Sequence, residues 1–151
     1  MNIGRMKQLR DHLASVDTRS FNMGDYLDTV TEEAGENWCG TVGCIAGHAV
    51  MVANPSVKGE YALRDLVQTD WDQELTGERG CVHVWARRWL GLERAEARAL
   101  FEPMSLHLNG LSYGEVTRAM ALEMLDLCIK REAVKGGWWS EAIDNCTGVS
   151  G

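Results

Sequence analysis

The sequence has 151 residues, 45% of them hydrophobic and 25% charged, and its 15 basic and 22 acidic residues give a formal net charge of −7. This length is typical of one domain with a sizeable core, and the near-average composition argues against a disordered chain. The acidic balance argues against direct nucleic-acid binding, which requires basic side chains opposite the phosphates, and no run of about 18 apolar residues is present to span a membrane.

Apolar residues recur every three to four positions through much of the chain, which is the spacing of one helix face. The first such segment is charged throughout and lacks the apolar core of a secretory signal, so we expect a cytoplasmic protein. Alternating apolar and polar runs, which would indicate strands, are missing apart from one short stretch that also fits a helix. In chain order, the spacing predicts helices over residues 3–16, 26–30, 42–53, 57–68, 82–90, 92–102 and 112–133.

Two of these helices define the expected architecture. Thr41 is the expected N-cap of the helix over 42–53, which should end before Asn54 because a residue preceding proline disfavours the α region. The helix over 112–133 has the broadest apolar face, which predicts a central and mostly buried position. We therefore expect an all-α, compact single domain of six or seven short helices around this central helix.

Residues 38–50, WCGTVGCIAGHAV, place two cysteines and one histidine among glycines and small side chains. One interpretation is a packing seam, in which small residues let a neighbouring backbone approach closely and Cys44 is a buried hydrophobe. A second is catalysis. With Thr41 as N-cap, Cys44 falls in the first turn, where the helix dipole favours a thiolate nucleophile, and His48 or His83 serves as the base.

A third interpretation is a structural zinc site, because such sites use cysteine and histidine ligands. The candidate ligands are Cys39, Cys44, His48, Cys81 and His83. Their spacing is not that of the common zinc motifs, so the first expectation is a protein without a cofactor. His12 and His107 stand apart from this motif and are expected on the surface or in loops. The chain has five cysteines, and this odd number predicts free thiols rather than a disulfide framework.

Acidic side chains gather ahead of this motif, where residues 25–36 contain no basic residue. A solvated acidic face and a docking surface for a basic partner both fit this pattern. The carboxylates that would contact such a partner are Asp25, Asp28, Glu32 and Glu33.

The final segment, residues 136–151, begins with two glycines followed by Trp138 and Trp139. Adjacent tryptophans cannot both face one core, so either is a candidate interface anchor. The alternative is that this segment packs as a final helix on the helical domain, residues 1–135. Its apolar positions would also allow a dimer.

Three segments resemble a group of small uncharacterised proteins encoded by bacteriophages and prophages. They are Phe-Asn-Met at 21–23, CGTVGCIAG at 39–47, and LGLERAEARALF at 90–101. No activity is established for this group, so the resemblance implies an origin, and with it a host cytoplasm, more than a mechanism. We therefore predict an accessory protein that binds a host or phage protein through an acidic and aromatic surface, as a counter-defence inhibitor would. A cysteine-dependent hydrolase or transferase and a small zinc-binding domain are the alternatives.

Overall fold

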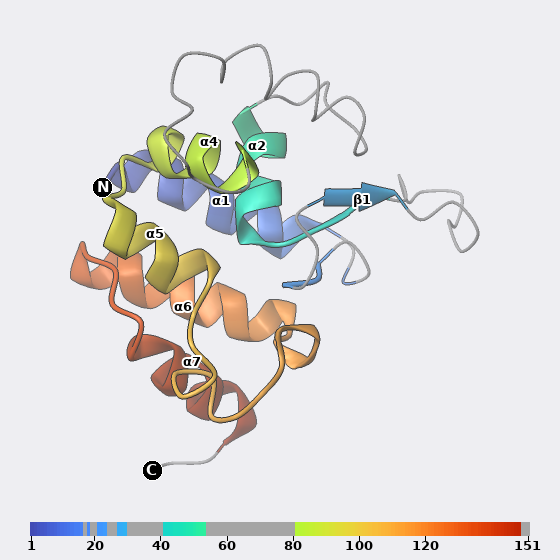
Figure 1. The fold of residues 1–151 in the computed structure, drawn as a ribbon, viewed down its shortest axis with the longest axis vertical. Helices are drawn as coiled ribbons and strands as arrows, with labels where there is room; N and C mark the ends of the chain where they lie inside the picture. The colour runs from blue at the N-terminus through green and yellow to red at the C-terminus, as the bar shows by residue number, and fades with distance from the viewer. Residues whose placement is uncertain (17, 19–20, 24–26, 30–40, 54–80, 149–151) are drawn as a thin grey trace.

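The protein is described here from a computed structural model, in which the described residues are 1–16, 18, 21–23, 27–29, 41–53 and 81–148. Helices dominate the fold, and one small sheet lies at one side (Figure 1). The elements are, in chain order, α1 (Ile3–Ser15), β1 (Leu27–Thr29), β2 (Thr41–Gly43), α2 (Ile45–Ala53), α4 (Cys81–Leu90), α5 (Arg94–Phe101), the 3-10 turn η2 (Tyr113–Glu115), α6 (Arg118–Arg131) and α7 (Trp138–Thr147). The all-α class is thus confirmed, and the helix expected over residues 57–68 lies outside the described residues.

The helix α1 forms where the sequence predicts it. The Asn2 side chain caps its start by accepting a hydrogen bond from the backbone N–H of Arg5 at 3.0 Å. Met6, Leu9 and Leu13 are fully buried, and their spacing of three to four residues gives the helix one apolar face. This face attaches α1 to both α2 and α6.

The start of α2 differs from the expectation. Residues 41–43 form strand β2, which pairs antiparallel with β1 so that Leu27 lies opposite Gly43 and Thr29 opposite Thr41. The absence of strands, the helix over 26–30 and the N-cap role of Thr41 were therefore wrong predictions. β-branched residues such as Thr41 suit a pleated strand, and a strand partner distant in the sequence overrides a local helix signal. The helix begins at Ile45 instead.

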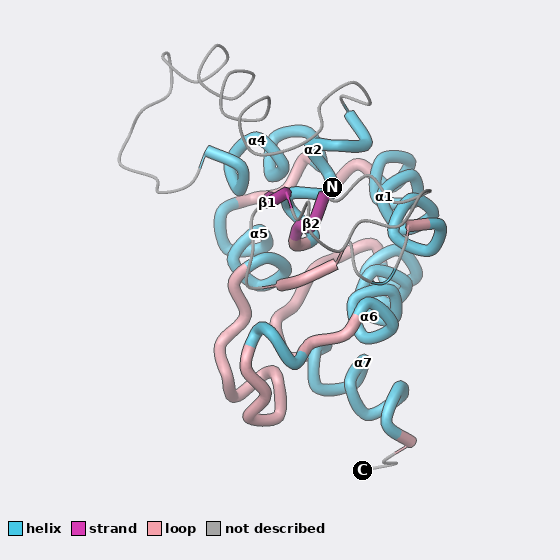
Figure 2. The backbone as a smooth tube through the Cα atoms, turned by 90° about the vertical axis from the view of Figure 1, so that its right-hand side faces the viewer, coloured by secondary structure: helices cyan, strands magenta, loops and turns pink. Residues whose placement is uncertain are grey.

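The central helix expected over 112–133 is α6, preceded by the separate turn η2. Thr117 divides the two, because its side chain caps α6 by accepting a hydrogen bond from the Met120 N–H at 3.2 Å. Figure 2 shows α6 between α1 and α7, and α6 packs against both. Its buried stripe consists of Met120, Ala121, Met124, Leu125 and Cys128.

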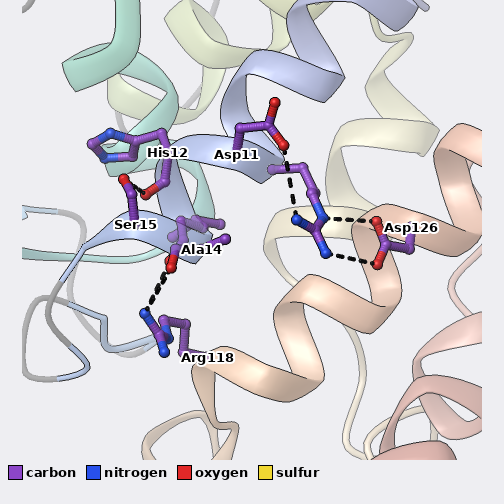
Figure 3. A network of polar contacts seen from close by, with 8 residues as sticks. Asp11, His12, Ala14, Ser15, Arg118 and Asp126 are labelled. Atoms are coloured by element: carbon purple, nitrogen blue, oxygen red, sulfur yellow. Dashed lines mark hydrogen bonds and ion pairs between the residues drawn. The ribbon is translucent and has the colours of Figure 1, made fainter.

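Two arginines join α1 to α6 (Figure 3). Arg10 donates two hydrogen bonds to the carboxylate of Asp126, with N···O distances of 2.9 and 3.4 Å. Arg118, the first residue of α6, donates to carbonyl oxygens at the C-terminal end of α1, those of Leu13, Ala14 and Val16. A helix end leaves such carbonyls without intrahelical partners, so Arg118 places a positive charge at the negative end of the α1 dipole.

The C-terminal segment packs on the helical domain as helix α7. Trp139 is fully buried, and its Nε1–H donates to the Ala99 carbonyl oxygen on α5 at 2.9 Å. Arg131 of α6 holds Glu141 of α7 through two hydrogen bonds of 2.8 Å. Among the described helices, none combines the length and apolar character needed to cross a membrane.

Candidate functional site

The motif at residues 38–50 places its described side chains inside the protein. Cys44 immediately precedes α2 rather than lying in its first turn, and it is 2% exposed. His48 lies one turn further, with its backbone N–H bonded to the Cys44 carbonyl oxygen at 2.9 Å, and it is fully buried. A catalytic thiol needs access to its substrate, whereas this geometry matches the packing-seam interpretation.

His48 meets a histidine that the sequence interpretation had placed on the surface. The Nε2 atom of His12 lies 2.9 Å from Nδ1 of His48, and the ring centroids are 5.1 Å apart. The ring of Phe21 stacks on His48 at 6.4 Å. Burial lowers the pKa of His12. A signal for this position exists in the sequence, because His12 follows the buried Leu9 by three residues and so shares its helix face.

His83 takes part in a second polar contact, on α4. Its Nδ1 lies 3.2 Å from Oε1 of Glu102, and its side chain is 12% exposed while that of Glu102 is 45% exposed. Phe101 packs beside the imidazole with a centroid distance of 5.3 Å. Burial lowers the pKa of His83, against the opposing effect of Glu102. A carboxylate on Nδ1 is how general bases are oriented, so His83 has that part of a catalytic arrangement.

The zinc hypothesis rests on the sequence spacing alone. Cys39 and the Cys81 side chain lie outside what the structure describes. In the described part of the chain, no three histidine, cysteine, aspartate or glutamate side chains gather so as to hold a metal ion. The described contacts instead join His48 to His12 and His83 to Glu102.

The acidic and aromatic surface is described only in part. Asp25, Glu32, Glu33 and the Asp28 side chain lie outside the described residues, although the Asp28 backbone pairs with β2. Trp139 belongs to the core. Trp138 is half-buried, with the guanidinium carbon of Arg131 4.8 Å and the ammonium nitrogen of Lys135 5.9 Å from its ring centroid.

The exposed apolar surface lies elsewhere, on residues 103–113, hereafter the 103–113 loop. Met104, Leu106 and Tyr113 are the exposed large hydrophobic residues of the described part, with exposed fractions of 62%, 78% and 37%. The Tyr113 hydroxyl donates to the Pro103 carbonyl oxygen at 2.9 Å and so closes the loop. We call these three side chains the apolar patch. This segment lies mostly between the helices expected over 92–102 and 112–133, and its sequence predicts no binding role.

The 103–113 loop is fixed to the helices beneath it. Leu108 is fully buried and anchors its middle. The Asn109 side-chain amide donates to Asp144 of α7 at 3.1 Å, and the Ser140 hydroxyl donates to the His107 carbonyl oxygen at 2.9 Å. Gly110 takes a φ of 82° that suits glycine at the turn. The patch is therefore presented on an ordered backbone.

The segment that carries the apolar patch contains acidic side chains and no lysine or arginine. Residues 99–117 contain two glutamates, Glu102 and Glu115, and no lysine or arginine. Hydrogen bonds from the backbone and side chain of Ser112 lower the pKa of Glu115, so this carboxylate is ionised at neutral pH. Asp144 adds a third carboxylate through its bond to Asn109.

Comparison with protein-family models, with curated proteins and with solved structures finds no match to this chain. What the protein does must therefore be argued from its own residues.

Proposed function

We propose that the chain is a phage- or prophage-encoded accessory protein that binds a host or phage protein through the 103–113 loop. The observation that carries this proposal is that all three exposed large hydrophobic side chains of the described part lie on this one loop. Inhibition of a host defence protein, in the host cytoplasm, is its concrete form. The phage origin rests on the sequence resemblance.

Burial of the apolar patch would supply binding energy. Covering an exposed leucine or methionine side chain is worth roughly 1.5–3 kcal/mol, and Leu106 and Met104 are the two most exposed members. The loop backbone is already ordered by its bonds to α7. Little conformational entropy would then be lost on binding, which favours affinity.

The charge around the patch defines the chemistry of the partner. Glu102, Glu115 and Asp144 favour a segment whose apolar side chains are flanked by lysine or arginine. Salt screens such attraction, so the association rate should fall as ionic strength rises. The acidic residues at 25–36 are proposed as a separate contact with the partner, and charge reversal at Asp25, Asp28, Glu32 and Glu33 tests that contact.

A matched pair of variants tests the proposal. Met104→Ser/Leu106→Ser removes the apolar patch, whereas Met104→Leu/Leu106→Met keeps it apolar. Proteins retained from a host lysate by the wild type are purified and titrated against all three forms. At least about a tenfold weaker Kd for the serine variant is expected, since 1.4 kcal/mol is tenfold. Equal affinity of all three forms would contradict the proposal, and a partner that proves to be a second copy of the chain would replace it with self-association.

A further inference from the structure

The contact between His12 and His48 joins the two helices α1 and α2 deep in the protein. Among the residues that the structure describes, His48 is the polar or charged residue with a buried side chain. Its Nδ1 lies 2.9 Å from Nε2 of His12. His48 sits on a helix segment, Ile45 to Val50, whose residues are all buried. A polar group at such a place normally has a hydrogen-bond partner, because leaving it unpaired is costly.

The number of protons on the pair decides whether this contact exists. At 2.9 Å, one of the two facing nitrogens carries a hydrogen and the other offers its lone pair. One added proton keeps the hydrogen bond but places a full charge among apolar side chains such as Phe21. Two added protons put an N–H on both facing nitrogens, so the two groups repel each other.

The surrounding charges do not favour a protonated pair. On α1, the exposed Asp11 is adjacent to His12, while α2 holds no charged residue besides His48. Arg118 of α6 brings a positive charge to the α1 turn that follows His12. The other titratable and charged groups on the described helices packed against α2 come from three helices. They are Arg5, Lys7 and Arg10 on α1, Cys81, His83, Arg87 and Arg88 on α4, and Arg94, Glu96 and Arg98 on α5, with Glu102 following α5.

We propose that the His12–His48 pair is a proton-sensitive contact that holds α2, and the strand β2 leading into it, against α1 at neutral pH and releases them in mildly acidic solution. The release is local. Two described contacts that hold α7, the Arg131–Glu141 ion pair to α6 and the Trp139 hydrogen bond to Ala99 of α5, involve no histidine, so that part of the protein stays folded over the same pH range.

The sign of the effect follows from proton linkage. Burial holds the pKa of His12 below its ordinary value of about 6.5, so the opened form binds more protons than the closed form as the pH falls below that value. The closed state is therefore fully favoured above about pH 6.5 and loses ground as the pH falls towards the lowered pKa. For each histidine that takes up a proton on opening, the equilibrium constant for opening rises by about tenfold per pH unit as the pH falls between the pKa values of its opened and closed forms.

Amide hydrogen exchange between pH 7.5 and 5, corrected for the intrinsic pH dependence of exchange, tests this proposal. For each histidine that takes up a proton on opening, protection of the α2 amides should fall by up to about tenfold per pH unit below pH 6.5, while protection in α6 and α7 stays constant. His12→Gln keeps a hydrogen-bonding side chain but removes one titrating ring. The pH dependence of α2 protection in this variant should therefore be weaker than in the wild type by about tenfold per pH unit. His107→Gln is the matched control and should behave as the wild type.

Two results would overturn the proposal. One is α2 protection that stays constant down to pH 5 in the wild type, and the other is a loss in His12→Gln as steep as in the wild type. If His12→Gln fails to fold, NMR titration of the imidazole signals in the wild-type protein decides instead. The His12 and His48 signals must then titrate together, and in step with the loss of α2 protection.

Discussion

The Tyr113 hydroxyl lies 2.9 Å from the carbonyl oxygen of Pro103, and this one hydrogen bond joins the two ends of the 103–113 loop. It brings Tyr113 to Pro103, the residue that directly precedes Met104 in the chain. The three exposed side chains all lie on this closed loop. The position of Tyr113 relative to Met104 therefore depends on this hydrogen bond.

Tyr113→Phe removes this hydrogen bond and keeps the aromatic ring. We expect the free energy of unfolding to fall by about 0.5–1.5 kcal/mol, the usual net worth of a hydrogen bond, and partner binding to weaken because the loop is less well ordered. Urea denaturation followed by circular dichroism measures the first effect. An unfolding midpoint identical to that of the wild type would show that the bond does not hold the loop.

Gly136→Ala tests the packing of the C-terminal segment against the same loop. A Cβ atom at Gly136 would lie 2.6 Å from Nδ1 of His107, whereas one at Gly137 would meet nothing within 4 Å. The Gly136 variant should therefore be destabilised, by about 1–3 kcal/mol as for other overpacked sites. Gly137→Ala, its matched control, should change the stability little.

Removal of the His107 ring supplies a second check on this contact. In the double variant Gly136→Ala/His107→Ala the clash is absent, so the stability should return towards that of His107→Ala alone. Additive losses in the double variant would mean that the two residues do not interact.

Arg118→Met should loosen the C-terminal end of α1. It removes the donor to the carbonyl oxygens of Leu13, Ala14 and Val16, and bonds to a charged group are worth about 1.5–3 kcal/mol. We expect the free energy of unfolding, measured by thermal or urea denaturation, to fall by that amount, and the amides at the end of α1 to exchange hydrogen faster. Lys130→Met, which removes an exposed charge at the other end of α6, is the control, and a loss of equal size there would contradict this role of Arg118.

Cysteine alkylation separates the packing interpretation of Cys44 from the catalytic one. Burial raises the pKa of Cys128 to about 12, and Cys44 is 2% exposed, so both should react with iodoacetamide only after unfolding. The exposed Cys146 should react first, and slowly, because its pKa is also raised. Peptide mass spectrometry assigns the adducts. Rapid, pH-dependent modification of Cys44 in the folded protein would instead favour the cysteine-dependent enzyme, with His83 and Glu102 as its base and orienting group.

The sequence predicted the helices whose signal is local. The apolar spacing in α1 and α6 depends only on neighbouring residues, and both helices lie within the expected ranges. The start of α2 could not be predicted in this way, because residues 41–43 pair with a strand 14 residues earlier at Leu27 to Thr29. Propensity does not report such a distant partner.

The functional residues were harder to predict than the helices. His12 is of interest because its ring contacts His48, which lies on another helix. The 103–113 loop has the sequence of an ordinary loop, although Leu108 is fully buried in it and Leu106 is 78% exposed. Both features depend on tertiary contacts that periodicity does not encode.

The central claim, that the 103–113 loop is the binding face, is tested most directly by hydrogen exchange in the complex with a purified partner. Peptides that cover residues 103–113 should exchange more slowly in the complex than in the free protein. Peptides from α1 should not change, and the Met104→Ser/Leu106→Ser variant should show no slowing. Protection confined to other segments, with residues 103–113 exchanging as in the free protein, would contradict the claim.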